Sequence, residues 1–204
     1  MTMYFVHPDG EIVTEISIRQ DQFKRGTMSR YHYPYRFMAL LDQNGQYAAM
    51  TRWIAETSID QLTYDLVFFL EYPRLRDALP ASEPLPTHYV KVFPHSHLAR
   101  IRREQLSVTI VANNPAFFSC RKGAAALEAI RFSAAFFGKG QFKAEKLEQT
   151  GNQFILRQSL AGPYYQPYPK DLLPEDGDWY KMPRSHRPQS EVQHYSALIT
   201  IFEE

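Results

Sequence analysis

The densest group of side chains that could transfer protons is the run Arg-Tyr-His-Tyr-Pro-Tyr-Arg at residues 30–36. A sugar lyase that removes the proton beside a uronic carboxylate needs a group that neutralises the carboxylate, a base, and an acid for the leaving oxygen. Tyr31, His32 and Tyr33 could supply the base and the acid. A helix start packed with aromatic residues explains the same run without chemistry, so both interpretations stay open.

Two further imidazoles, His95 and His97, are separated by one serine. On a β-strand this spacing places both side chains on the same face. They could be half of a metal site, polar groups in a substrate cleft, or part of a partly solvated strand end. Zinc usually has three or four ligands, and no nearby acidic residue completes such a set. We therefore expect neither a metal nor a cofactor.

Several arginines are suited to an acidic polysaccharide. Arg100 and Arg102 alternate with Ile101, which places both guanidinium groups on one face of a strand and Ile101 in the core. Guanidinium groups bind carboxylates and sulfates through paired hydrogen bonds. Arg19 is a further candidate of this kind. The alternative is that the two strand arginines occupy the solvated outer face of a sheet.

A tyrosine-rich stretch near the end of the chain could stack against sugar rings. Tyr164 and Tyr165 follow a Gly-Pro pair, and Trp179 comes after a proline-rich loop. Aromatic faces of this kind suit the flat apolar side of a sugar. The same residues could instead act as a lid that clamps the long loop to the rest of the protein.

The composition is that of an ordinary folded protein, with 44% hydrophobic and 22% charged residues and a net charge of +1. This charge gives no electrostatic reason to expect nucleic acid or a membrane surface as a partner. The single cysteine, Cys120, favours a buried apolar role over a reactive thiol. The N-terminus has no secretory signal pattern, which favours the cytoplasm.

Residues 73–87 separate two patterns of hydrophobicity. Before them we expect a β-hairpin around the Asp9-Gly10 turn and then three short helices. One helix is expected to end at Asn44-Gly45, and another to begin with a capping box at Ser58. We expect residues 1–77 to form a cap or the remnant of a helical domain and residues 78–87 to be a linker.

The second pattern, in residues 88–204, consists of short apolar runs bounded by turn residues. The expected strands are 89–93, 98–103, 106–112, 116–121, 127–137, 141–147, 153–159 and 195–202, and residues 161–193 are expected to be irregular. No helical pattern separates these runs, so the strands should be antiparallel. The predicted fold is mainly β with a helical N-terminal segment (α+β), and its strands form an antiparallel β-sandwich.

Several stretches together resemble the C-terminal part of the heparinase II/III-like polysaccharide lyases. In that family an α/α toroid is followed by an antiparallel β-sandwich. The similar stretches are Tyr4–Glu11, Ser17–Asp21, Tyr31–Pro34, Ala99–Arg103 and Phe136–Phe142. The resemblance implies that the toroid, with most of the family's catalytic residues, lies outside this chain. It also implies a histidine near the cleft, for which His95 and His97 are the nearest candidates.

We therefore expect the β-sandwich portion of a heparinase-like lyase, which acts on or binds acidic polysaccharide or oligosaccharide and is not a complete catalyst alone. The alternative is a non-catalytic carbohydrate-binding or assembly module. A homodimer or a missing helical domain would cover the apolar helix faces. The expected catalytic residues are Tyr31, His32, His95 and His97, and the expected substrate-binding residues are Arg19, Arg100, Arg102, Tyr164, Tyr165 and Trp179.

Overall fold

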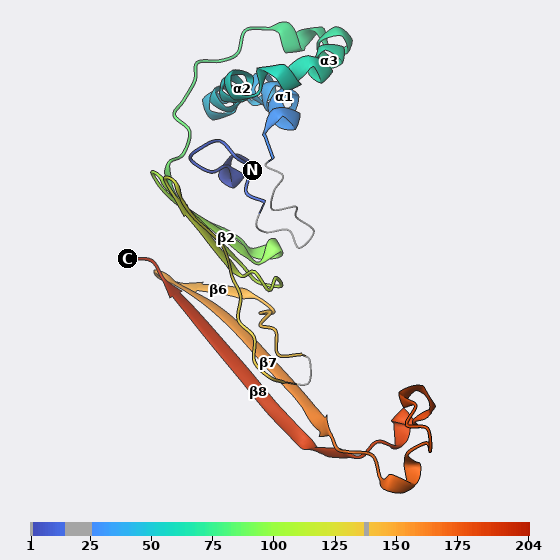
Figure 1. The fold of residues 1–204 in the computed structure, drawn as a ribbon. Coiled ribbons are helices and arrows are strands. Elements are labelled where there is room, and N and C mark those ends of the chain that lie inside the picture. The colour runs from blue at the N-terminus through green and yellow to red at the C-terminus, as the bar shows by residue number, and fades with distance from the viewer. Residues whose placement is uncertain (1, 15–25, 137–138) are drawn as a thin grey trace. The chain divides into compact units, whose positions relative to one another are not determined.

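The structure is a computed structural model that describes residues 2–14, 26–136 and 139–204. The chain folds into two compact units, Met1–Ile130 and Arg131–Glu204. The first contains helices and a five-stranded sheet, and the second a three-stranded sheet, each sheet being antiparallel (Figure 1). The predicted α+β class is confirmed. The sandwich and the division at residues 78–87 stay predictions.

Three α-helices form the helical part of the first unit: α1 (His32–Asp42), α2 (Gly45–Thr57) and α3 (Leu66–Glu71). Short 3-10 helices occupy Thr2–Phe5, Ser29–Tyr31, Ile59–Asp65 and Pro73–Arg76. The buried residues Val6, Met28, Tyr35, Met50 and Ile54 form the core here. The helices thus enclose part of the N-terminal segment, because Val6 belongs to the same core.

Two predicted helix boundaries are wrong. Asn44 does not end α1; instead its side chain accepts a hydrogen bond from the Tyr47 backbone N–H and caps the start of α2. Gln43 ends α1 in the left-handed conformation, with a φ of 50°. The Ser58 side chain makes no capping hydrogen bond, and a 3-10 helix precedes α3. A polar residue between two adjacent helices can serve either one, which the sequence pattern alone does not decide.

Apolar side chains of α1 and α3 remain exposed. Leu41 is 64% exposed and Leu70 is 73% exposed, and further examples are Phe37, Met38, Leu66 and Val67. Helices of this kind are stabilised by packing of their apolar faces. The homodimer or helical domain that would cover these faces stays a prediction.

The predicted N-terminal hairpin is reduced to one isolated bridge between Val6 and Ile12. The turn itself forms, since the His7 N–H donates to the Glu11 carbonyl at 2.8 Å and Gly10 has a φ of 91°. The Tyr4 and Val6 carbonyls accept hydrogen bonds from arginine side chains of the sheet. Residues 15–18 of the predicted hairpin lie outside the described residues.

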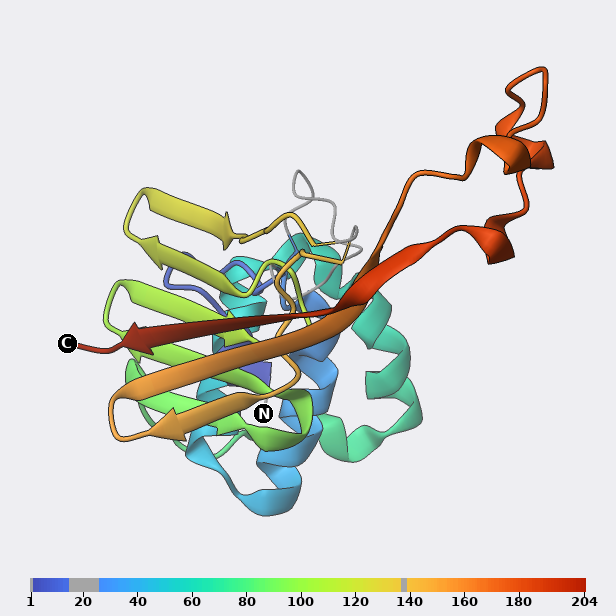
Figure 2. The ribbon, with the colours of Figure 1, turned by 90° about the horizontal axis from the view of Figure 1, so that it is seen from below.

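The sheet of the first unit has the order β1-β2-β3-β4-β5 (Figure 2). Its strands are β1 (His88–Phe93), β2 (Leu98–Arg103), β3 (Leu106–Val111), β4 (Phe118–Lys122) and β5 (Ala125–Ile130). In β2, Arg100 and Arg102 share one face, and Ala99 and Ile101 lie on the other and are buried. The prediction that Ile101 belongs to the core is confirmed.

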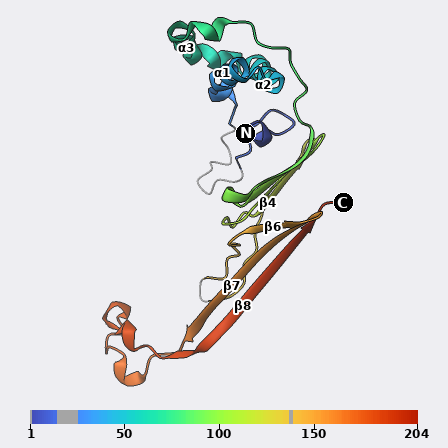
Figure 3. The same cartoon turned by 180° about the vertical axis from the view of Figure 1, so that it is seen from behind.

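The second unit has the sheet order β6-β7-β8, with β6 at Leu147–Thr150, β7 at Gln153–Tyr165 and β8 at Gln189–Phe202. β7 and β8 form a long hairpin, and the loop between them, residues 166–188, extends from its end (Figure 3). Three 3-10 helices shape this loop: Lys170–Leu172, Trp179–Lys181 and Arg184–His186.

Three predicted segments in residues 125–193 differ from the structure. The strand expected at 127–137 ends at Ile130, and the one expected at 141–147 contributes only Leu147. Among the described residues 131–136 and 139–146, one isolated bridge joins Ser133 to Gln141, and residue 137 of the expected strand lies outside the described residues. β7 and β8 extend into the region expected to be irregular. Pro163 is tolerated within β7 because the strand register shifts there.

Candidate functional site

The N-terminal segment crosses the arginine-bearing face of the first sheet, and Arg100 is the centre of this contact. Its side chain is fully buried. It donates from Nε to the Tyr4 carbonyl at 3.0 Å, from Nη1 to the Val108 carbonyl at 2.9 Å, and from Nη2 to Ser107 Oγ at 2.7 Å. The expectation of a solvated outer face is therefore wrong for Arg100. Its hydrogen bonds join the segment to the sheet.

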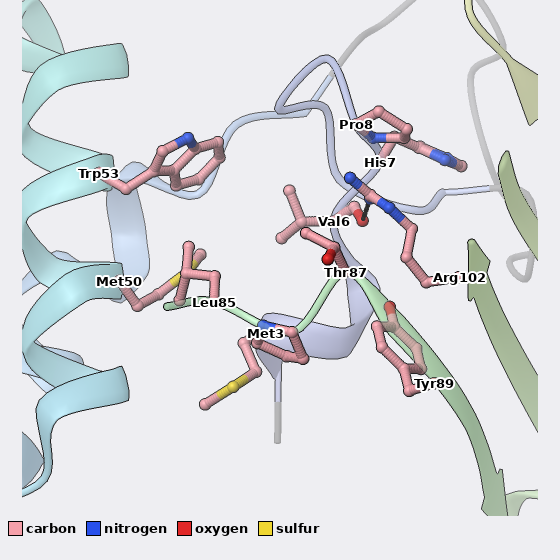
Figure 4. A pocket seen from close by; sticks show the side chains of 11 residues that line it. Met3, Val6, His7, Pro8, Met50, Trp53, Leu85, Thr87, Tyr89 and Arg102 are labelled. Carbon is pink, nitrogen blue, oxygen red and sulfur yellow. Dashed lines mark hydrogen bonds between the residues drawn. The ribbon is translucent and has the colours of Figure 1, made fainter. Parts of the chain in front are cut away.

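Arg102 lies on the same face and lines a pocket of about 150 Å³ in the first unit. Its Nε donates to the Glu104 carbonyl at 2.6 Å and its Nη1 to the Val6 carbonyl at 3.2 Å. Burial lowers the pKa of the guanidinium, an effect opposed by the nearby Tyr89, Asp9 and Glu104. Figure 4 shows Arg102 and Tyr89 on the sheet side of this pocket and Trp53 on the helix side.

The pocket has a polar and an apolar part. The polar residues are His7, Thr87, Tyr89 and Arg102, and the others are Met3, Val6, Pro8, Met50, Trp53, Leu85 and Pro86. The Tyr89 hydroxyl donates to the Tyr4 carbonyl at 3.1 Å. Burial raises the pKa of Tyr89, so this hydroxyl keeps its proton at neutral pH. The pocket therefore combines an arginine with a mainly apolar wall.

His7 connects the pocket to Arg100. It is buried, and its Nδ1 lies 3.0 Å from Ser107 Oγ, the same hydroxyl that accepts a hydrogen bond from Arg100. The Ser107 hydroxyl can accept from the guanidinium and donate to the imidazole at once. The His7 ring is thereby fixed in place at the edge of the pocket.

The residues predicted as acid and base lie among the helices. His32 is buried, and its Nδ1 is 2.7 Å from Asp65 Oδ2, which orients the imidazole as in many catalytic pairs. The His32 ring stacks on Phe69 with 6.3 Å between centroids. Tyr31 is 37% exposed and lines a separate cavity with Thr2, Pro34, Tyr35, Met38 and Tyr47.

His95 and His97 do not lie on a strand, so their predicted shared strand face is wrong. Pro94 begins a 3-10 helix, and His97 has a φ of 47°, which turns the chain from β1 into β2. This turn lies at the opposite end of the β1–β2 hairpin from Arg102, whose partner in register is Tyr89. Among residues 2–14, 26–136 and 139–204, no group of three or more His, Cys, Asp or Glu could hold a metal.

The loop of the second unit brings three aromatic rings around one arginine. The Arg187 guanidinium lies 5.0 Å from the centroid of Tyr165, 5.5 Å from Tyr168 and 5.8 Å from Trp179. Arg184 lies 5.7 Å from the Trp179 ring, on which Tyr168 packs edge to face. We call these five residues the aromatic–arginine cluster.

The other predicted sugar-binding residues lie elsewhere. Tyr164 packs against Phe136 with 6.4 Å between centroids, and its backbone N–H donates to Ser190 Oγ. Arg19 lies outside the described residues. The structure therefore brings Tyr165 and Trp179 together, and it places Arg102 in a different unit.

The two arginines of the cluster, Arg184 and Arg187, were not identified from the sequence. Nor were His7, Trp53 and Tyr89 identified as residues of the pocket. The signal for the cluster was present, since two arginines follow the Trp-Tyr pair in the same loop. No local pattern indicated the pocket, because its walls come from four separate segments, residues 3–8, 50–53, 85–89 and 102.

Cys120 lies in β4 and is partly buried. Burial raises the pKa of its thiol, with a smaller opposing effect from Lys122. Because the thiolate is the reactive form, we expect iodoacetamide to modify Cys120 more slowly than a free cysteine peptide at pH 8. Mass spectrometry of both in one tube measures the two rates. Modification as fast as that of the peptide would contradict this expectation.

Comparison of the chain with family models, with curated proteins and with solved structures gave no match in any of the three. The similarity to heparinase II/III-like proteins therefore stays a prediction. No helix within residues 2–14, 26–136 and 139–204 is long and apolar enough to span a membrane.

Proposed function

We propose that this chain binds acidic polysaccharide through the aromatic–arginine cluster and is not a complete catalyst alone. Both the expected lyase portion and the alternative binding module would bind a polysaccharide in this way. The observation that carries the proposal is that the Arg187 guanidinium is held in a fixed position. Three rings and one hydrogen bond, from Nε to the Gln166 carbonyl at 2.9 Å, hold its guanidinium.

The terminal nitrogens of Arg187 have no hydrogen-bond partner among the described residues, nor has Arg184 an ion-pair partner there. A guanidinium whose plane is already fixed loses little freedom when it binds a carboxylate or sulfate. These groups are polar donors suited to an anionic sugar.

The rings beside these donors are accessible. Tyr165 is 58% exposed and Trp179 is 45% exposed. If these aromatic residues only held the long loop against the rest of the protein, their rings would be buried. A sugar-binding surface instead needs the ring faces to be exposed. Exposure at the end of a hairpin also suits a long polymer, which an enclosed pocket cannot admit.

The test is calorimetric titration of the intact chain with heparin-derived and oligogalacturonate hexasaccharides, with maltohexaose as the neutral sugar. We expect binding of an acidic hexasaccharide, and Arg187→Gln should weaken it about tenfold or more, since hydrogen bonds to charged groups contribute roughly 1.5–3 kcal/mol. Arg187→Lys should recover little of the loss, because an ammonium group cannot form the paired contact.

Arg157→Gln is the matched control, since it removes an equal charge from an exposed position in β7 near Glu148. It should change affinity less than threefold. Equal binding of maltohexaose, or an equal loss with Arg157→Gln, would show that the cluster does not select acidic sugars. The same mixtures, followed by the absorbance of a new carbon–carbon double bond, report lyase activity, which we expect to be absent.

A further inference from the structure

We propose that the pocket lined by Arg102 and Trp53 binds a small carboxylate attached to an apolar ring, with Arg102 holding the carboxylate. This site lies in the first unit and the aromatic–arginine cluster in the second. It is therefore a second ligand site, and it does not depend on the function proposed for the cluster.

Arg102 retains donors for a ligand. Its two hydrogen bonds go to backbone carbonyls and use Nε and one N–H of Nη1. The described residues offer no partner to Nη2 and no carboxylate in an ion pair with this guanidinium. The carbonyls of Val6 and Glu104 hold the guanidinium at the pocket, so it is positioned before a ligand arrives (Figure 4).

The pocket has the size of a single ring. Its volume is about 150 Å³, and an apolar cavity of roughly this volume in another protein holds benzene. Trp53 lies across the pocket from Arg102, and Met50 and Leu85 continue the apolar wall (Figure 4). A ligand with an apolar ring and one carboxylate would meet complementary groups at both ends.

The remaining polar groups favour an apolar ring over a sugar. The Tyr89 hydroxyl already donates to the Tyr4 carbonyl, and Thr87 Oγ1 lies 3.2 Å from His88 Nδ1. A uronic acid ring would bring several hydroxyls that need partners, and buried hydroxyls without partners weaken binding. The chemistry therefore points to an aromatic or cyclic carboxylic acid.

Trp53 reports on this pocket. The chain has two tryptophans, so Trp179→Phe leaves Trp53 as the only indole. In this background, benzoate should produce a saturable change in Trp53 fluorescence with a Kd of about 0.1–1 mM, a usual range for so small a ligand. Benzyl alcohol, which lacks the charge, and glucuronate, which carries hydroxyls, should each bind at least tenfold more weakly.

Arg102→Gln should weaken benzoate binding about tenfold or more, whereas Arg103→Gln, the same change at the next residue, should have little effect. Because Arg102→Gln also removes hydrogen bonds within the unit, thermal unfolding of each variant is measured alongside. Leu85→Phe is a second test, since it narrows the pocket and leaves the partners of Arg102 in place. It should also reduce benzoate binding.

Four results would overturn the proposal: no saturable response to benzoate, equal benzoate affinity in folded Arg102→Gln, glucuronate binding as tight as benzoate, or benzyl alcohol binding as tight as benzoate. A loss of oligosaccharide binding at the cluster would leave all these outcomes unchanged, so failure of one proposal is distinguishable from failure of the other.

Discussion

Replacement of Arg100 by methionine should lower the free energy of unfolding of the first unit by about 3 kcal/mol or more. Methionine keeps most of the volume but donates no hydrogen bond. The change leaves the Val108 carbonyl and the Thr109 hydroxyl without their arginine donor at a fully buried site, whereas the Tyr4 carbonyl keeps its hydrogen bond from the Tyr89 hydroxyl. Each unsatisfied buried group costs roughly 1–3 kcal/mol. Loss of a buried charge offsets part of this cost, so the estimate lies in the lower half of the roughly 2–6 kcal/mol expected for two such groups.

The measurement is urea unfolding followed by Trp53 fluorescence in the Trp179→Phe background, which reports on the unit that contains Arg100. Lys91→Met is the matched control. Lys91 pairs with Arg100 in register but is exposed, and its Nζ lies 5.7 Å from the centroid of the Tyr4 ring. It should change stability by less than about 1 kcal/mol. Equal effects of the two substitutions would refute the structural role of Arg100.

The strands of the first unit were predictable because each shows local alternation and ends at a recognisable turn. The expected segment 98–103 matches β2, and the expected segments 89–93 and 106–112 match β1 and β3 within one residue. The prediction of a strand at 127–137 was wrong, and for a reason that lies outside the segment. Its apolar residues are as suitable for a strand, but residues 132–134 are hydrogen-bonded to residues 140–142 and not to a neighbouring long strand. Strand pairing of this kind is decided by distant contacts.

The role of Arg100 could not be predicted from the sequence. Alternation along a strand shows which residues share a face of the sheet, but it does not show which segment covers that face. The covering segment is Tyr4–Glu11, which is almost one hundred residues away in the sequence. The cluster around Arg187 shows the same limit. Tyr165 and Trp179 were predicted from residue type alone. Arg187 joins them because β7 and β8 pair in a register that ends at Tyr165 and Gln189.

Replacement of Gly140 by alanine should destabilise the second unit by about 3 kcal/mol, at the upper end of the usual cost of overpacking. A Cβ at this position would lie 1.8 Å from the Ala134 carbonyl oxygen and 2.7 Å from its carbon. Both are backbone atoms, so no side-chain rotation relieves the overlap. The Ala134 N–H donates to the Gly140 carbonyl at 2.8 Å, and the substitution must separate these two segments.

Gly151→Ala separates this steric effect from the backbone effect of losing a glycine. Gly151 has a φ of 59° and open space around its Cβ position, so alanine there should cost only about 1 kcal/mol. Hydrogen exchange of peptides covering residues 131–144 measures the difference, since the Ala134 and Phe142 amides are both hydrogen-bonded across this turn. Gly140→Ala should accelerate their exchange strongly and Gly151→Ala should not. Unchanged exchange in Gly140→Ala would show that the two backbone segments do not approach as closely as the structure places them.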